Sequence, residues 1–302
     1  MIELALGKVR PSESDLIGHM SVQYYVARAV DCLPVLGVEL GLGPRRCREL
    51  NIELAATEHH LRFHNELGPE AGYSIGGGIL GIENEQLRLY QEIRNIASGD
   101  VAATIITMAA AVDSASRARR PLPLNLLART ASLIVDLPDY GAPRGIDSVL
   151  PRPRPVWDEA DRLGLMTAQQ STVIAEECDG RGFFTARAVM ERVTEATPHQ
   201  FARLNWPAYN DGSVGWIVLE SRLVYHANPR LGDVLTLRCG LVAIGTKTTR
   251  WVHWVMDRET GEAVATVAAV IAVFDLAARK VVTLDDSLRQ CMESRLVPAL
   301  SA

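Results

Sequence analysis

An aspartate, a glycine and a histidine lie close together in the segment Asp15-Leu-Ile-Gly-His-Met-Ser-Val-Gln-Tyr-Tyr25. Asp15 and Gly18 predict a turn, and we expect a helix to follow over residues 20–36. The start of a helix presents backbone N–H groups without intrahelical partners and a partial positive charge, which can bind a developing oxyanion. Asp15 beside such a site can act as base or nucleophile, and His19 can donate a hydrogen bond or orient a water molecule.

The same residues also fit a purely structural role. Aspartate is favoured at the N-terminus of helices, and a single Asp-x-x-Gly turn is common. The neighbouring His19 favours the catalytic interpretation, so Asp15 and His19 are the candidate catalytic residues.

Three blocks of the first half of the chain recur in the second half in the same order. The block Ser98-Gly-Asp-Val-Ala-Ala-Thr104 recurs in related form at an offset of 162, and so does the block Glu58-His-His-Leu-Arg-Phe-His64. Asp15-Leu-Ile-Gly18 pairs with Asp179-Gly-Arg-Gly182 at an offset of 164. Such internal similarity predicts that one structural unit has been duplicated.

The elements expected in each unit are one main helix and several strands. In the second unit the helix is expected at residues 183–194. Hydrophobic alternation predicts strands at 58–66 and 86–95, because successive side chains of a strand point to opposite faces. The continuous apolar runs 101–112 and 264–274 predict central strands that are buried on both faces.

The domain organisation follows from the repeat and from the distribution of proline. We predict a first unit at residues 1–120 and a second unit at 171–302. Between them, residues 121–170 contain seven prolines and form the expected connector, with a helix at 124–135. Helical spacing of apolar residues predicts a C-terminal helix at 285–299.

Composition limits the classes of protein to which the chain can belong. Of its 302 residues 48% are hydrophobic and 22% charged, with a net charge of −5, which excludes a disordered chain. The negative balance disfavours nucleic-acid binding, and the longest apolar runs are too short to cross a membrane, which takes about 20 residues. Five scattered cysteines without a Cys-x-x-Cys pair favour free thiols. We expect a cytoplasmic protein with no metal and no cofactor, and with neither nucleic acid nor membrane as partner.

The Asp15 segment resembles the Asp-x-Asn-Gly-His-Met-Asn-x-x-x-Tyr signature of hotdog-fold acyl thioesterases, of the hydroxybenzoyl-CoA and acyl-ACP thioesterase kind. Ile17 and Ser21 stand where that pattern has asparagines. The block that ends at Thr104, the strand end at Asp113 and the later Arg-Pro-Leu-Pro are also similar to this family. The residues that match the signature are Asp15, Gly18, His19, Met20 and Tyr25.

The resemblance implies an α+β double hotdog fold, in which two repeats each have a long central helix wrapped by an antiparallel β-sheet. It implies an acyl thioester hydrolase of fatty acid metabolism, acting on an acyl-CoA or acyl-carrier-protein substrate with Asp15 as base or nucleophile. The candidate substrate-binding residues at the helix start are Gly18, Met20, Ser21, Val22 and Tyr25.

Three further residues are candidates for substrate binding. Glu58 and His64 lie on one face of a predicted strand, although their recurrence as Glu220 and His226 also fits a structural or interface role. No further cluster completes a metal site around them. Arg117 can meet the phosphates of coenzyme A, because the planar guanidinium group suits phosphate geometry, although a solvated surface charge is the commoner explanation for such a residue.

The second unit keeps only part of the candidate site. Asp179 and Gly182 preserve the turn, but Phe183 replaces His19. We therefore expect the second turn to be weakened or structural, with Asp179 and Glu191 as the counterparts of the first site. Glu191 fits a solvated helix residue as well.

Two other functions remain open. A hotdog hydratase of enoyl or hydroxyacyl thioesters is disfavoured, because that pattern places its histidine five residues after the aspartate with a proline between them. A non-catalytic acyl-thioester binding protein stays open, since Ile17 replaces an asparagine of the signature. A homodimer is an open alternative to a monomer.

Overall fold

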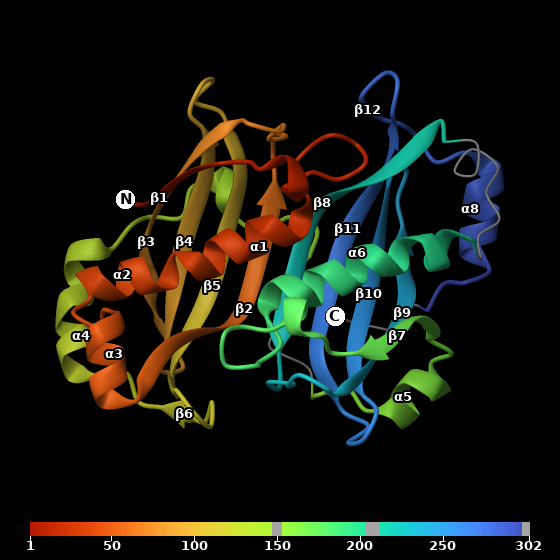
Figure 1. Ribbon diagram of the computed structural model, residues 1–302. Helices are drawn as coiled ribbons and strands as arrows, with labels where there is room; N and C mark the ends of the chain where they lie inside the picture. The colour runs from red at the N-terminus through yellow and green to blue at the C-terminus, as the bar shows by residue number, and fades with distance from the viewer. Residues whose placement is uncertain (147–152, 203–211, 298–302) are drawn as a thin grey trace. The chain divides into compact units, whose positions relative to one another are not determined.

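The computed structural model describes residues 1–146, 153–202 and 212–297 of the chain (Figure 1). The chain divides into two compact units, Met1–Pro143 and Arg144–Ala302. Within these described residues, no helix is long and apolar enough to cross a membrane.

The first unit packs helices against one antiparallel sheet. Gln91 of this sheet donates a hydrogen bond from Nε2 to the Ala29 carbonyl of helix α1 (2.9 Å). Helix α1 therefore lies against the face of the sheet from which the Gln91 side chain projects. The strands in spatial order are β1 (Ile2–Lys8), β3 (Gly72–Glu83), β4 (Gln86–Asn95), β5 (Val101–Asp113) and β2 (Ile52–Phe63), with β6 (Arg119–Arg120) paired to β5. The helices are α1 (Val22–Asp31), α2 (Leu33–Glu39), α3 (Pro44–Leu50) and α4 (Leu124–Thr130).

The helix expected at residues 20–36 is present as two consecutive helices, α1 and α2. Cys32 joins them in helical geometry. Pro34 follows directly, and because proline has no N–H group it cannot continue the hydrogen-bond ladder of α1. The prediction of a single long helix is therefore wrong at this point, although the two segments lie end to end in Figure 1.

The second unit repeats this plan with one longer helix. Helix α6 (Ala186–Ala202) buries Phe201, which stacks on Trp216 with a centroid distance of 4.1 Å. The strands in spatial order are β8 (Val214–Tyr225), β11 (Ala263–Asp275), β10 (Thr248–Asp257), β9 (Val234–Ile244) and β7 (Met166–Thr172), with β12 (Lys280–Val281) paired to β11. The other helices are α5 (Trp157–Arg162) and α8 (Asp286–Glu293).

Corresponding elements confirm the duplication. β2 begins at Ile52 and β8 at Val214, an offset of 162, and the next three strands of each unit keep this offset. The first strand and the helix start keep an offset of 164, as Val22 and Ala186 illustrate. The two offsets found in the sequence thus differ because the second unit has a slightly shorter chain between its helix start and the next strand.

The continuous apolar runs are strands, as expected. β5 and β11 are buried over most of their length, which explains why neither alternates between apolar and polar residues. The C-terminal helix is shorter than predicted, because α8 ends at Glu293, and residues 298–302 lie outside the described part of the chain. The helix expected at 124–135 is α4 followed by a 3-10 turn.

Candidate functional site

Asp15 and His19 lie in a closed turn between β1 and α1. The Asp15 N–H donates to the His19 carbonyl (2.9 Å), and the Gly18 N–H donates to the Asp15 carbonyl (3.1 Å). Asp15 Oδ1 accepts hydrogen bonds from the N–H groups of Ile17 (2.9 Å) and His19 (3.4 Å). Gly18 has a φ of +87°, a conformation that side chains disfavour. The turn thus fixes the orientation of the Asp15 carboxylate.

The His19 imidazole lies between two carboxylates. Its Nδ1 is 3.2 Å from Asp15 Oδ2, and its Nε2 is 3.8 Å from Glu66 Oε1. His19 is mostly buried, whereas the two carboxylates keep contact with solvent. Sequence reasoning missed Glu66. The sequence did contain a signal for it. The second unit has Asn228 at the position that corresponds to Glu66, so this carboxylate differs between the two units, as His19 does.

Helix α1 starts beside this pair without a side-chain cap. Ser21, its N-cap residue, turns its hydroxyl to Gln23 Oε1 (2.5 Å) instead. The N–H groups of Met20 and Ser21 donate to the carbonyls of Leu67 (2.7 Å) and Glu13 (2.9 Å), so they are already used. Within the described residues, the N–H groups of Val22 and Gln23 have no acceptor. Of the candidate binding residues Met20, Ser21 and Val22, only Val22 therefore has an N–H group that is available to a ligand.

Tyr25 lies behind the turn rather than on its surface. It is 3% exposed and packs edge-on against Phe63, with ring centroids 5.2 Å apart. Burial raises the pKa of Tyr25 above its usual value, a hydrogen bond with the Leu67 backbone opposes this, and the charges of Glu66 and Asp15 add to the rise. Tyr25 is therefore a neutral phenol close to both carboxylates.

The turn of the second unit has the same backbone. The Asp179 N–H donates to the Phe183 carbonyl (2.8 Å), and Asp179 Oδ1 accepts from the N–H groups of Arg181 (2.9 Å) and Phe183 (3.0 Å). Gly182 has a φ of +81°, like its counterpart. The Phe183 ring lies under the Arg230 guanidinium at 4.2 Å. This turn therefore holds a carboxylate but no imidazole.

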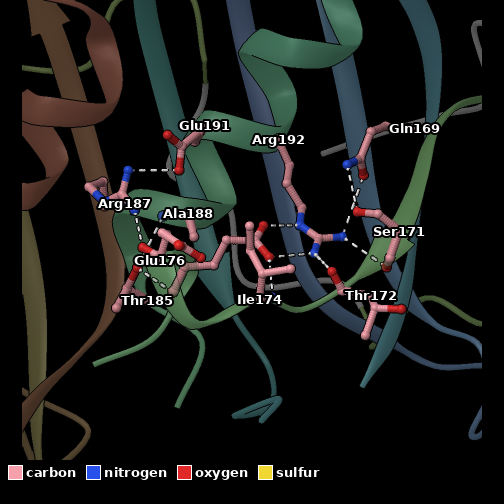
Figure 2. Close-up of polar contacts among 11 residues, drawn as sticks. Gln169, Ser171, Thr172, Ile174, Glu176, Thr185, Arg187, Ala188, Glu191 and Arg192 are labelled. Atoms are coloured by element: carbon pink, nitrogen blue, oxygen red, sulfur yellow. Dashed lines mark hydrogen bonds and ion pairs between the residues drawn. The ribbon is translucent and has the colours of Figure 1, made fainter. Parts of the chain in front are cut away.

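Side-chain hydrogen bonds surround the start of α6 (Figure 2). Thr185 Oγ caps the helix by accepting from the Ala188 N–H (3.2 Å). Arg187 donates to Glu191 Oε2 (2.7 Å) and to the Glu176 carbonyl (2.5 Å). Glu191, named from the sequence as a second-unit counterpart of the first site, is thus held in an ion pair on its own helix.

The other predicted binding residues lie in contacts of their own. His64 Nε2 is 3.1 Å from Thr104 Oγ, and its ring packs edge-on against Tyr140. His226 makes the matching contact with Thr266 at 3.3 Å. Because this contact recurs in both units, it supports the structural alternative for His64.

Glu58 and Arg117 are also placed by the structure. Glu58 is half-buried on β2, and Arg117 forms an ion pair with Glu53. The ion pair occupies the guanidinium group that was expected to meet phosphate. Among the described residues, no group of three or more histidine, cysteine, aspartate or glutamate side chains is placed to hold a metal ion.

Comparison with known proteins identifies the family and the fold of the chain. A family model described as "Thioesterase-like superfamily" matches residues 9–130 and 155–291. No curated protein sequence matches the chain. The structure is similar to an acyl-ACP thioesterase from Bacteroides thetaiotaomicron, with a TM-score of 0.65, 13% identity and coverage of 88% of this chain and 96% of that one. It is also similar to a 12:0-ACP thioesterase from Umbellularia californica, with a TM-score of 0.60, 8% identity and coverage of 89% and 93%. These similarities confirm the α+β tandem hotdog fold.

Proposed function

We propose that this chain, a member of the thioesterase-like superfamily, hydrolyses thioesters at the Asp15 turn of its first unit. The observation that carries this proposal is the position of His19 between Asp15 and Glu66 at an uncapped helix start. An acid–base pair next to free N–H groups is the arrangement that thioester hydrolysis needs.

In the proposed reaction, the thioester carbonyl lies over the start of α1. The N–H groups of Val22 and Gln23 stabilise the oxyanion that develops when the carbonyl carbon is attacked. Asp15 Oδ2 takes the proton of the attacking water, because Oδ1 already accepts two backbone hydrogen bonds. His19 donates a hydrogen bond that orients the carboxylate. The carbon–sulfur bond then breaks, and the thiolate leaves and takes up the proton held by Asp15, which restores the carboxylate.

Direct attack by Asp15 is the alternative course at the same residue. It would form an acyl-aspartyl anhydride, which water then hydrolyses. Ile17 occupies the place of the asparagine that the signature provides, so a water molecule at this site would be held by Asp15 and His19 alone.

We propose an acyl-CoA or an acyl carrier protein as substrate, on the support of family membership and of relatives named as acyl-ACP thioesterases. The test is release of free thiol from a panel of acyl-CoAs and acylated carrier proteins by the wild type and by Asp15→Asn. Hydrolysis by the wild type and its loss in the variant support the proposal. Equal rates would refute the role of Asp15.

The same panel separates the rival functions. Loss of the enoyl absorbance without thiol release would identify a hydratase. Binding of an acyl thioester without either change would identify a non-catalytic binding protein.

A further inference from the structure

One ion pair recurs at the same place in both units. In the first unit, Arg28 of α1 binds Glu13, which ends the 3-10 helix Pro11–Glu13 just before the turn. In the second unit, Arg192 of α6 binds Glu177, which ends the 3-10 helix Ala175–Glu177. The two residues of each pair are fifteen positions apart, and the aspartate turn lies between them.

The first pair closes the loop that contains the proposed catalytic residues. The Glu13 carboxylate accepts from the Arg10 N–H (3.1 Å), and the Glu13 carbonyl accepts from the Ser21 N–H (2.9 Å). Asp15 and His19 both lie between positions 13 and 21. Since Arg28 ties Glu13 to the helix, loss of the Glu13 carboxylate would loosen this end of the loop and leave the backbone bond between Glu13 and Ser21 to hold it.

The second pair makes the same contacts, and its arginine is more deeply buried than Arg28. The Glu177 carboxylate accepts from the Ile174 N–H (2.9 Å), and the Glu177 carbonyl accepts from the Thr185 N–H (3.0 Å). Arg192 is fully buried and donates to both carboxylate oxygens of Glu177, at 2.5 and 2.8 Å. Figure 2 shows Arg192 extending from α6 toward the backbone of Thr172 on β7.

On the premise of the proposed function, we infer that Glu13 and Arg28 are a positioning pair for the hydrolytic site. They hold the loop that carries Asp15 and His19 against α1. Glu177 and Arg192 hold a loop with the same backbone hydrogen bonds, which carries Phe183 in place of the histidine. The second pair therefore serves stability alone, which makes it an internal control for the first.

The test compares Glu13→Gln with Glu177→Gln. Misplacement of a catalytic group by about 1 Å costs up to about a hundredfold in rate, so Glu13→Gln should lower kcat about tenfold to a hundredfold. KM should stay within about twofold, because the variant leaves α1, with the N–H groups of Val22 and Gln23, in place. Glu177→Gln should leave kcat of the folded enzyme unchanged.

The effects on Tm should have the opposite order, with the larger decrease in Glu177→Gln. Glu177→Gln leaves a buried guanidinium without its counter-charge and should lower Tm by about 5 °C or more. Glu13→Gln should lower Tm less, because Arg28 is partly exposed and keeps a second carboxylate, Asp31, at 3.1 Å. A purely structural role for both pairs predicts that loss of activity follows loss of stability.

A second measurement does not depend on activity. In protein labelled with ¹⁵N-histidine, Glu13→Gln should shift the imidazole resonances of His19, and Glu177→Gln should not. The inference is overturned if Glu13→Gln keeps the wild-type kcat and the wild-type His19 spectrum, or if Glu177→Gln lowers kcat equally. A wild type without hydrolytic activity would refute the proposed function instead, and the His19 spectrum would still test the pair.

Discussion

The turns before α1 and α6 share a backbone and differ in chemistry. Both have an aspartate whose Oδ1 accepts two N–H groups and a glycine in the left-handed conformation. The first turn adds His19 and the neighbouring Glu66, where the second has Phe183 and Asn228. The shared part explains how the turn folds, and the difference lies in the residues around Asp15 at which we propose that catalysis takes place.

The comparison also separates two uses of a helix start. Thr185 caps α6, whereas Ser21 leaves α1 uncapped. An uncapped helix start lacks the stabilisation of about 1 kcal/mol that a side-chain cap provides, but its partial positive charge stays accessible to an anion. The start of α1 therefore lacks a stabilising contact that the start of α6 has, and it is there that we propose the oxyanion forms.

His19→Phe tests the difference most strongly, because it gives the first turn the residue of the second. We expect kcat to fall about a hundredfold, the usual contribution of a positioned proton-transfer group. Steady-state thiol release is the measurement. The matched change Phe183→His should create no new activity, since Asn228 replaces the second carboxylate. A gain of activity in that variant would show that the second turn lacks only its histidine.

The pH dependence of stability should reveal a buried histidine in each unit. Burial lowers the pKa of His59 to about 3 and that of His253 to about 4. Both pKa values lie below that of the unfolded chain, about 6.5, so the unfolded state binds more protons in between. Stability should therefore fall as the pH drops below about 6.5, by up to about 1.4 kcal/mol per pH unit for each histidine.

Urea denaturation at several pH values measures this slope. His253→Gln should flatten it, whereas His199→Gln, a change at an exposed histidine, should leave it unchanged. An unaltered slope in His253→Gln would show that this histidine does not titrate with unfolding.

Corresponding positions in the sheets of the two units give a second contrast. Glu92 of β4 accepts hydrogen bonds from the hydroxyls of Tyr140 (2.6 Å) and Tyr90 (2.8 Å), where β10 has Trp254. Burial raises the pKa of Glu92, but its hydrogen bonds outweigh this and hold the pKa below its usual value.

Tyr140→Phe removes one hydrogen bond to this carboxylate. We expect a loss of about 1–2 kcal/mol of unfolding free energy at neutral pH, because the acceptor is charged. The loss should shrink as the pH falls through the pKa of Glu92, since protonation removes the charge. Tyr24→Phe is the control, because its long contact to Ser12 is exposed. Equal effects in chemical denaturation would contradict the assigned contact.

The smallest effect concerns the N-cap residues of α1 and α6. Thr185→Ala should cost about 1 kcal/mol of unfolding free energy, because it removes the cap of α6. Ser21→Ala should cost a few tenths of a kcal/mol at most, since Ser21 does not cap α1. Equal losses would indicate that Ser21 caps its helix in solution.

Much of the fold could be predicted from the sequence, because the offset of the repeat and the pattern of apolar residues can be read directly from it. The two central strands, the alternating strands and the offsets of 164 and 162 all correspond to observed elements. The break between α1 and α2 could have been predicted, since Pro34 is visible in the sequence. The ends of the helices could not, because they depend on tertiary contacts such as those of Phe201.

The candidate site was predictable only in part. Asp15 and His19 are near in sequence, so their contact follows from the turn itself. Glu66 comes to His19 from another segment of the chain, and only the fold brings it there. The occupied N–H groups of Met20 and Ser21 were equally hidden, because their acceptors, Leu67 and Glu13, lie outside the segment.

The most direct test of the account is the kcat of Asp15→Asn beside that of Asp179→Asn, measured as thiol release from the best acyl thioester of the panel. The two aspartates have the same backbone contacts, so the two variants should disturb folding alike. The account predicts a loss of about a hundredfold or more for Asp15→Asn and wild-type kcat for Asp179→Asn. Equal losses, or a greater loss for Asp179→Asn, would contradict the assignment of the hydrolytic site to the first unit.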